Sequence, residues 1–102
     1  MHGEELDFLK LVIMNYFDLE SKDFFFKSRL NNIVYARRIF FYLANLHLNK
    51  QQTFISDYLK CPLSSVSYGK NKIIRLLASG DKELIKDLKQ IKKLLSNKNG
   101  KG

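Results

Sequence analysis

The chain has 102 residues with 18 basic and 10 acidic side chains, which gives a formal net charge of +8. This length fits one domain, and a hydrophobic fraction of 45% is enough for one modest core. The apolar runs are too short to span a membrane, and the acidic start, MHGEELDFLK, is unlike a signal peptide, so we expect a cytoplasmic protein. The single cysteine, Cys61, excludes an intrachain disulfide.

The positive charge lies in the body of the chain. Residues 1–26 hold six acids and two lysines, whereas residues 27–102 hold sixteen bases and four acids. A surface of this kind predicts a polyanionic partner, either nucleic acid or an anionic membrane face. A charge that serves only solubility is the alternative.

Apolar residues recur at helical spacing along most of the chain, and strand-like alternation is scarce. We therefore predict an all-α fold, a small bundle of about five helices. Residues 1–95 are expected to form a single domain, and residues 96–102 a disordered basic tail. The predicted helices cover about residues 4–17, 33–48, 51–59, 64–78 and 82–95.

The connector after the first helix and the helix that follows it carry more specific expectations. The run Phe24–Phe26 is expected to plug the core, with an exposed docking site as the alternative. Asn31 or Asn32 is the expected N-cap of the second helix. The buried stripe of that helix is predicted to end at Leu46 or His47.

The second half of the chain contains three breaks in its helical pattern. Proline disfavours helix at the residue before it, so Pro62 marks a turn. Gly69 is expected to allow close packing of the fourth helix. Gly80 is expected to end that helix, and Ser79 or Asp81 is expected to be the N-cap of the fifth helix. The predicted core face of the fourth helix is Val66, Ile73, Ile74 and Leu77.

The short third helix, the turn and the polar fourth helix have the layout of a helix-turn-helix. In that motif the second helix enters the major groove of DNA. Asn71 could form paired hydrogen bonds with adenine, and Lys72 could form a hydrogen bond with guanine. Lys70, Lys72 and Arg75 are suited to binding phosphates. A bundle with a solvated basic face is the alternative. The hydroxyl side chains that would meet bases or phosphates are Ser64, Ser65, Ser67 and Tyr68.

Three stretches give the chain a family resemblance over about residues 5–95. The stretch FKSRLNNIVYARRIFFYLANL resembles a basic loop followed by a helix of pattern "R…iv.aRqiamyLa". The stretch FISDYLK stands where the family has the short first helix of its helix-turn-helix. The stretch SSVSYGKNKI resembles the recognition-helix pattern "TTVxHxxxKI". The chain thereby resembles the C-terminal DNA-binding domain of the bacterial chromosomal replication initiator DnaA. This resemblance implies a Trp-repressor-like helix-turn-helix fold and double-stranded DNA as partner.

The resemblance also implies particular DNA contacts. Arg29, with Lys27 close by, matches a basic-loop arginine that enters the minor groove, and Arg37 matches an arginine that contacts DNA. Arg38 replaces the usual glutamine, and Tyr68 stands at a position that is often histidine. The DNA-binding residues that we expect are Lys27, Arg29, Arg37, Arg38, Gln52, Ser64, Ser65, Ser67, Tyr68, Lys70, Asn71, Lys72 and Arg75.

Two departures from the family pattern affect the expected function. LKCPLSSV stands in place of GGRDHTTV, so Cys61, Pro62 and Leu63 replace an arginine, an aspartate and a histidine that read bases or hold phosphates. No GxxxxGK[ST] phosphate loop occurs, so we expect no ATPase activity. We therefore expect a regulator or accessory factor in replication or transcription, encoded by a host, a plasmid or a phage. The alternative is a protein-interaction module that kept the fold and lost base reading.

No residue pattern predicts catalysis. His2, His47 and Cys61 have no metal-ligand spacing, so we expect no enzyme activity, no cofactor and no metal. The expected partners are double-stranded DNA at the nucleoid and, as an option, a protein, with no membrane and no small-molecule substrate. A membrane-surface helix at residues 82–93 is disfavoured because it lacks aromatic residues. A solvated face is predicted for Lys86, Lys89, Lys92 and Lys93 together with Asp87.

Overall fold

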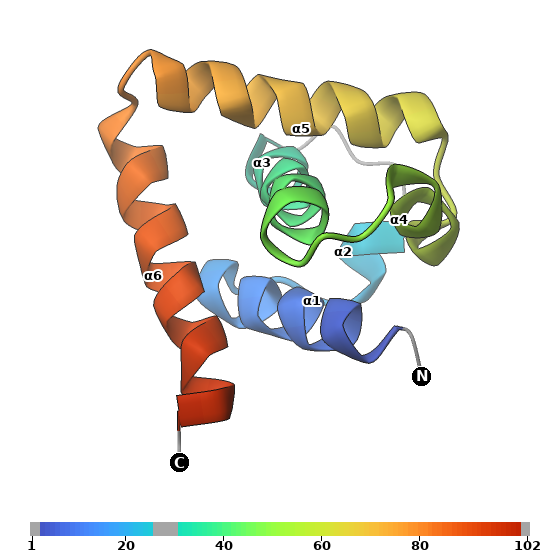
Figure 1. The fold of residues 1–102 in the computed structure, drawn as a ribbon, viewed down its shortest axis with the longest axis horizontal. Helices are drawn as coiled ribbons and strands as arrows, with labels where there is room; N and C mark the ends of the chain where they lie inside the picture. Colours follow the sequence, from blue (N-terminus) through green and yellow to red (C-terminus); the bar gives the residue numbers. More distant parts are fainter. Residues whose placement is uncertain (1–2, 26–30, 101–102) are drawn as a thin grey trace.

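The structure is a computed structural model that describes residues 3–25 and 31–100, without the side chains of residues 25 and 97–100. All regular elements in these residues are helical, which confirms the predicted all-α fold (Figure 1). The elements are α1 (Glu4–Phe17), α2 (Lys22–Phe25), α3 (Asn31–Tyr42), the π-helical turn η1 (Leu43–His47), α4 (Gln52–Leu59), α5 (Leu63–Ala78) and α6 (Lys82–Gly100).

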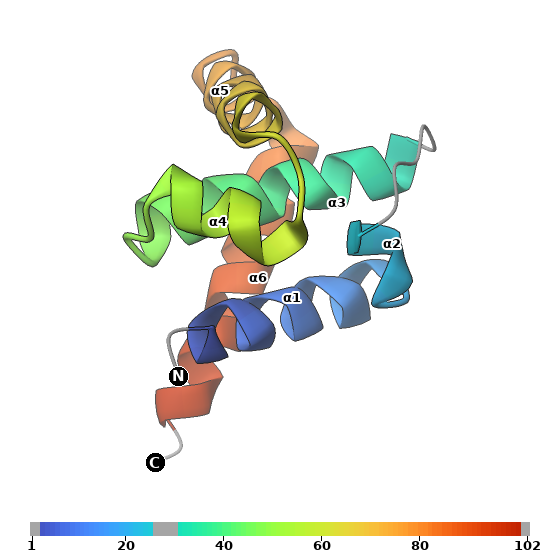
Figure 2. The ribbon, with the colours of Figure 1, turned by 90° about the vertical axis from the view of Figure 1, so that its right-hand side faces the viewer.

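The helices stack around α3. Figure 2 shows α5 on one side of α3 and α1 on the other, with α4 beside α3. Helix α6 runs down one edge of the stack, on the left in Figure 1. The central position of α3 follows from its sequence, because apolar residues surround most of its circumference. Its buried side chains are Ile33, Ala36, Ile39, Phe40 and Phe41.

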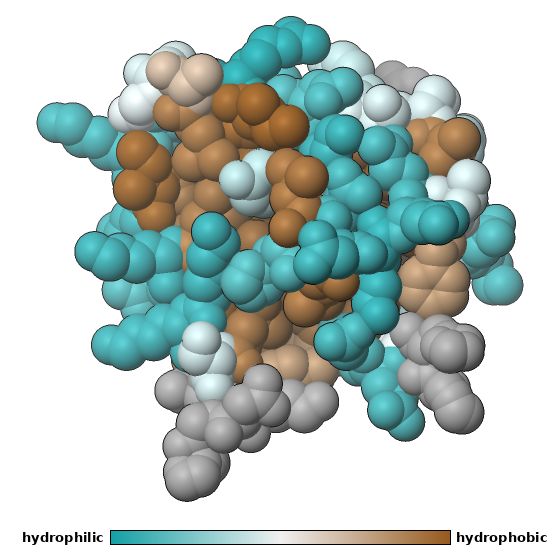
Figure 3. Space-filling view, in the orientation of Figure 1, coloured by the Kyte–Doolittle hydropathy of each residue, from teal (hydrophilic) through white to brown (hydrophobic). Residues whose placement is uncertain are grey.

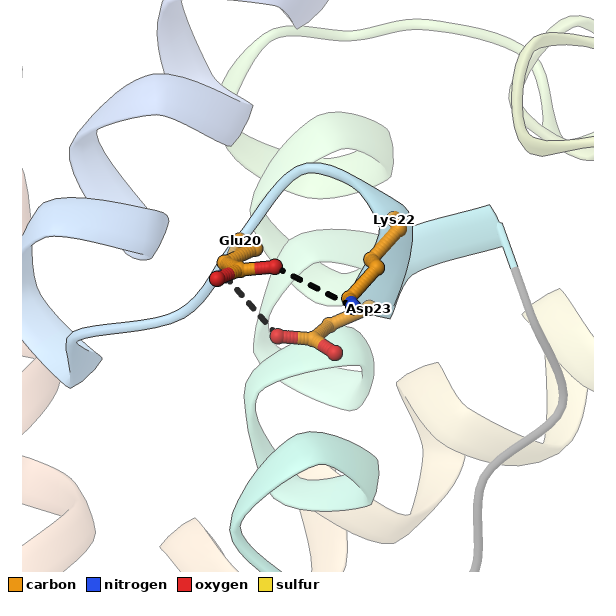
Figure 4. Close-up of polar contacts among 3 residues, drawn as sticks. All are labelled: Glu20, Lys22 and Asp23. Carbon is orange, nitrogen blue, oxygen red and sulfur yellow. Dashed lines mark hydrogen bonds and ion pairs between the residues drawn. The ribbon is translucent and has the colours of Figure 1, made fainter.

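The connector after α1 contains the short helix α2, which is not among the helices predicted from the sequence. The Asp23 carboxylate accepts a hydrogen bond from the Glu20 backbone N–H at 2.8 Å, and Lys22 forms an exposed ion pair with Glu20 at 3.4 Å (Figure 4). Phe24 is fully buried and packs edge-on against Phe40, with ring centroids 5.7 Å apart. The predicted core plug is therefore confirmed for Phe24, while Phe26 lies outside the described residues.

The predicted second helix differs from the structure at both ends. Asn31 and Asn32 lie inside α3, so neither is its N-cap. After Tyr42 the chain widens into η1, and a π-turn takes an extra residue, which rotates the following side chains. Leu46 and His47 therefore face solvent, contrary to prediction.

The junction between α5 and α6 has the predicted capping. Gly80 adopts a left-handed φ of 79°, and the Asp81 carboxylate accepts a hydrogen bond from the Leu84 backbone N–H at 2.9 Å. Ile74 was expected in the core but is exposed on α5. Helix α6 continues to Gly100, beyond the end predicted for the fifth helix at residue 95, because no proline or glycine interrupts residues 82–99 and extending a helix is cheaper than starting one.

A buried carboxylate joins three helices. Asp87 of α6, only 5% exposed, accepts hydrogen bonds from the Tyr16 hydroxyl of α1 at 2.7 Å and the Tyr35 hydroxyl of α3 at 3.0 Å. The prediction of a solvated Asp87 was wrong, because the two hydroxyls come from residues distant in sequence. The hydrogen bond to Asp87 is the main cause that raises the pKa of Tyr16 to about 12 from its ordinary 10.0.

Replacing Tyr16 by phenylalanine is expected to lower the free energy of unfolding by about 1.5 kcal/mol near neutral pH, because a hydrogen bond to a charged group is lost. The Tyr16 pKa is higher in the folded than in the unfolded state, so its contribution is complete below pH 10 and is lost as pH rises toward 12. Urea denaturation across this range should show the stabilities of the parent and Tyr16→Phe converging. A constant difference up to pH 12 would contradict this.

Candidate nucleic-acid interface

The two helices of the helix-turn-helix are joined by a tight three-residue turn. Lys60 adopts a left-handed φ of 54°, and the Cys61 backbone N–H donates to the Ser56 carbonyl at 3.0 Å, which closes the end of α4. Pro62 is extended and precedes the first turn of α5, where its carbonyl accepts the Ser65 N–H at 3.0 Å. The turn thus sets α5 directly after α4 at a sharp angle (Figure 2).

Gly69 sets how closely α5 approaches α3. A Cβ atom at this position would lie 2.7 Å from Cδ2 of Phe41 and 3.2 Å from Cγ of Arg38. The close packing predicted from the sequence is therefore confirmed. It brings the side chains of α3 alongside the N-terminal half of α5.

A hollow of about 160 Å³ lies between α3 and α5. Four of the expected DNA-binding residues meet there, two from each helix: Arg37 and Arg38 of α3, and Ser65 and Tyr68 of α5. Two cations and two hydroxyl groups around one concave surface suit a phosphate group and the base edges beside it. The full lining is Val34, Arg37, Arg38, Phe41, Ser65, Tyr68 and Gly69.

Aromatic rings hold both arginines of the hollow. The Arg38 guanidinium lies 5.3 Å from the ring centroid of Tyr68, which is 55% exposed, and the Arg37 guanidinium lies 5.9 Å from that of Phe41. The Nε of Arg37 is buried and has no hydrogen-bond partner in the part of the chain that the structure describes. Within that part, neither arginine takes part in an ion pair. An anion that entered the hollow would therefore meet two guanidinium groups that no carboxylate of the described residues neutralises.

The other expected residues of α5 divide between two sides of the helix. Ser64, Tyr68, Asn71 and Arg75 are exposed and follow one another at i, i+4, i+7 and i+11, so they share the outward face. Lys72 stands seven residues after Ser65 and so lies on the same flank as the hollow.

Three expected site residues are not brought to this surface. Ser67 and Lys70 are half-buried and align at helical spacing with Ile74, on the flank of α5 away from Ser65. Gln52, half-buried at the start of α4, does not line the hollow. Lys27 and Arg29 lie outside the described residues.

Three residues of the hollow were not anticipated as part of the site: Val34, Phe41 and Gly69, of which Gly69 was expected only to allow close packing. Val34 and Phe41 stand four residues before Arg38 and three residues after it, so helical spacing alone could have placed all three on one face of α3. Phe41 supplies the ring under Arg37 and is almost fully buried. It connects the site to the core.

The turn before α5 presents an apolar surface. Leu63 is exposed at the start of the helix, and Cys61 is half-buried beneath it in the turn. Burial raises the pKa of the Cys61 thiol, and the nearby Arg37 guanidinium opposes the rise. The turn therefore offers DNA no charged side chain at residues 61–63.

In residues 3–25 and 31–100, no helix combines the length and apolarity needed to cross a membrane. In the same residues, no three His, Cys, Asp or Glu side chains gather as a metal site would require.

A helix-turn-helix with a basic hollow beside its second helix defines a DNA-binding module. The family described as the bacterial DnaA protein helix-turn-helix matches residues 7–73, and the chain belongs to this family of DNA-binding domains. The matched region begins in α1 and ends within α5, so it contains the whole hollow and leaves out α6. No curated protein and no solved structure matches the chain.

Proposed function

We propose that residues 1–95 act as one domain that binds double-stranded DNA, with the N-terminal half of α5 in the major groove. The observation that carries this proposal is the meeting of Arg37, Arg38, Ser65 and Tyr68 around one hollow. Family membership supports the same partner. In this arrangement α3 lies beside the groove, and its two arginines hold a backbone phosphate.

The outward face of α5 supplies the base contacts in this proposal. Ser64, Tyr68 and Asn71 are exposed and point away from the core, where hydroxyl and amide groups reach base edges. Arg75 lies one turn further along and binds phosphate. Leu63 replaces a polar reader with an apolar side chain that suits the methyl group of thymine, so the preferred site differs from the usual origin box.

We further propose that the protein is a regulator or accessory factor in replication or transcription, and that it acts at the nucleoid without hydrolysing ATP. The lack of a GxxxxGK[ST] motif in its sequence supports this. Lys27 and Arg29, in the segment before α3, complete the interface at the minor groove or backbone.

A protein-interaction module is the second candidate. It is favoured by the apolar turn, because Cys61 and Pro62 stand where the family pattern has a charged arginine and a charged aspartate. Leu63 stands where the pattern has a histidine. The DNA-binding module should bind duplex DNA with an affinity that falls as the salt concentration rises, whereas the protein-interaction module should not bind duplex DNA.

The first test is a titration of labelled duplexes, one random and one with an origin box, at several salt concentrations. Six cations at the proposed surface (Lys27, Arg29, Arg37, Arg38, Lys72 and Arg75) predict that log Kd rises with log salt with a slope of about 5.4. Equal affinity for both duplexes is expected if the turn no longer reads the box. Failure to bind either duplex at low salt would favour the protein-interaction module.

A further inference from the structure

A second concave surface lies where α5 and α6 meet. This α5–α6 groove has a volume of about 340 Å³ and is lined by Tyr42, Leu77, Ile85, Leu88, Lys89 and Lys92. Figure 3 shows brown, apolar surface gathered at the upper left, over the corner between these two helices. Leu88 is buried and forms the floor, whereas Ile85 is 46% exposed on the wall.

The lining from α6 has the spacing of a helix-docking surface. Ile85, Leu88, Lys89 and Lys92 stand at i, i+3, i+4 and i+7, so they form one continuous stripe along the helix. Ile74, also exposed, lies one turn before Leu77 on α5 and extends the apolar surface. A stripe of this kind receives the matching stripe of another amphipathic helix.

The rim of the groove is positively charged. Residues 82–96 contain five lysines and two acids, and one of these acids, Asp87, is buried and hydrogen-bonded to two tyrosines. In the part of the chain that the structure describes, no ion pair involves a lysine of α6. Apolar surface flanked by unpaired lysines is complementary to an apolar stripe flanked by acids.

We propose that the α5–α6 groove docks an amphipathic helix of a partner protein, with acidic side chains beside its apolar stripe. A second copy of this chain fits poorly, because each copy carries a net charge of +8 and the two would repel each other. DNA fits poorly as well, because a nucleic-acid backbone offers no partner for Ile74, Leu77 and Ile85.

The groove is separate from the hollow proposed for DNA. Tyr42 ends α3, whereas Val34 and Arg38 of the hollow lie one to two turns earlier on the same helix. On α5 the groove takes Leu77, and the hollow takes Ser65, Tyr68 and Gly69 near the other end. The partner helix and duplex DNA are therefore expected to bind at the same time.

The test uses a labelled synthetic peptide helix with leucines at i, i+3, i+4 and i+7 and glutamates on both sides, and binding is followed by fluorescence anisotropy. Ile85→Ser is expected to weaken binding about tenfold through lost apolar contact. Lys89→Glu with Lys92→Glu should weaken it further, and a peptide with lysines in place of glutamates should bind at least about tenfold less well.

Leu94→Ser is the matched control, because Leu94 is 41% exposed on the opposite side of α6 from Ile85 and should leave binding unchanged. Circular dichroism establishes that each variant is folded. The proposal is overturned if the acidic peptide does not bind or if Ile85→Ser and Leu94→Ser bind it alike. Binding to anionic lipid vesicles in place of the peptide would also overturn it.

A parallel titration with duplex DNA separates this proposal from the DNA-binding function. Ile85→Ser should bind duplex as the parent protein does. A loss of duplex binding in folded Ile85→Ser would assign the groove to the DNA surface and so overturn the docking proposal. Absence of duplex binding in the parent protein would overturn only the proposed function, because peptide binding is measured without DNA.

Discussion

Replacing Arg37 and Arg38 together by alanine is expected to weaken binding to duplex DNA at least about 100-fold at fixed salt concentration. Each arginine would donate charge-assisted hydrogen bonds to phosphate, which contribute about 1.5–3 kcal/mol for each group. The Nε of Arg37 is already buried without a partner, and both guanidinium groups rest on aromatic rings. Little side-chain entropy is therefore lost when they meet a phosphate, so most of the hydrogen-bond energy appears as affinity.

Two further variants separate geometry from charge at these positions. Lys86→Ala with Lys93→Ala removes the same charge from exposed positions of α6 and should weaken binding by only a few-fold through the long-range field. Arg37→Lys with Arg38→Lys keeps the charge but loses the planar fork, so an intermediate affinity is expected. Equal effects of the two alanine pairs would show that the hollow has no special role.

Gly69→Val is expected to lower the free energy of unfolding by about 2 kcal/mol, the cost of overpacking a tight helix contact. The added Cβ would lie 2.7 Å from Cδ2 of Phe41, which is itself buried and packs edge-on against Phe40 with ring centroids 6.3 Å apart. The ring cannot move aside without disturbing the core, so α5 must shift away from α3. The gain in helix propensity on leaving glycine offsets only part of this cost, about 0.5 kcal/mol.

Urea denaturation measures this effect, and Phe41→Leu provides the matched test of its cause. If the clash with the ring is responsible, the double variant should be more stable than the sum of the two single effects predicts. Gly80→Val is a useful contrast, because nothing lies within 4 Å of a Cβ there and only the left-handed φ is strained. Strict additivity of Gly69→Val and Phe41→Leu would contradict the clash.

Much of the fold could be predicted because its signals are local. Helical spacing of apolar residues, the turn at Pro62 and the break at Gly80 gave the main helices to within a few residues. The π-turn at residues 43–47 could not be predicted in this way, because a π-turn has no distinct spacing until the surrounding helices are in place. Asp87 was misjudged for the same reason, since its partners Tyr16 and Tyr35 are distant in sequence.

The candidate site, like the fold, could be predicted from the sequence only in part. The family pattern placed Arg37, Arg38, Ser65 and Tyr68 on two separate helices, and the structure brings them together. Ser67 was included for its hydroxyl group and Lys70 as a phosphate contact, but their positions along the helix turn both to the other flank of α5. The stacking of Arg38 on Tyr68 could not be predicted, because it depends on the distance that Gly69 sets between α3 and α5.

The buried carboxylate of Asp87 has a consequence for how this protein can change over evolution. It fastens α6 to α1 and α3 through Tyr16 and Tyr35, and none of its hydrogen bonds reaches α5. The outward positions of α5 are therefore free to vary without loosening the framework. In the proposed interface, new DNA preferences are expected from exchanging Ser64 or Asn71 alone, which would make this small scaffold a practical starting point for engineered specificity.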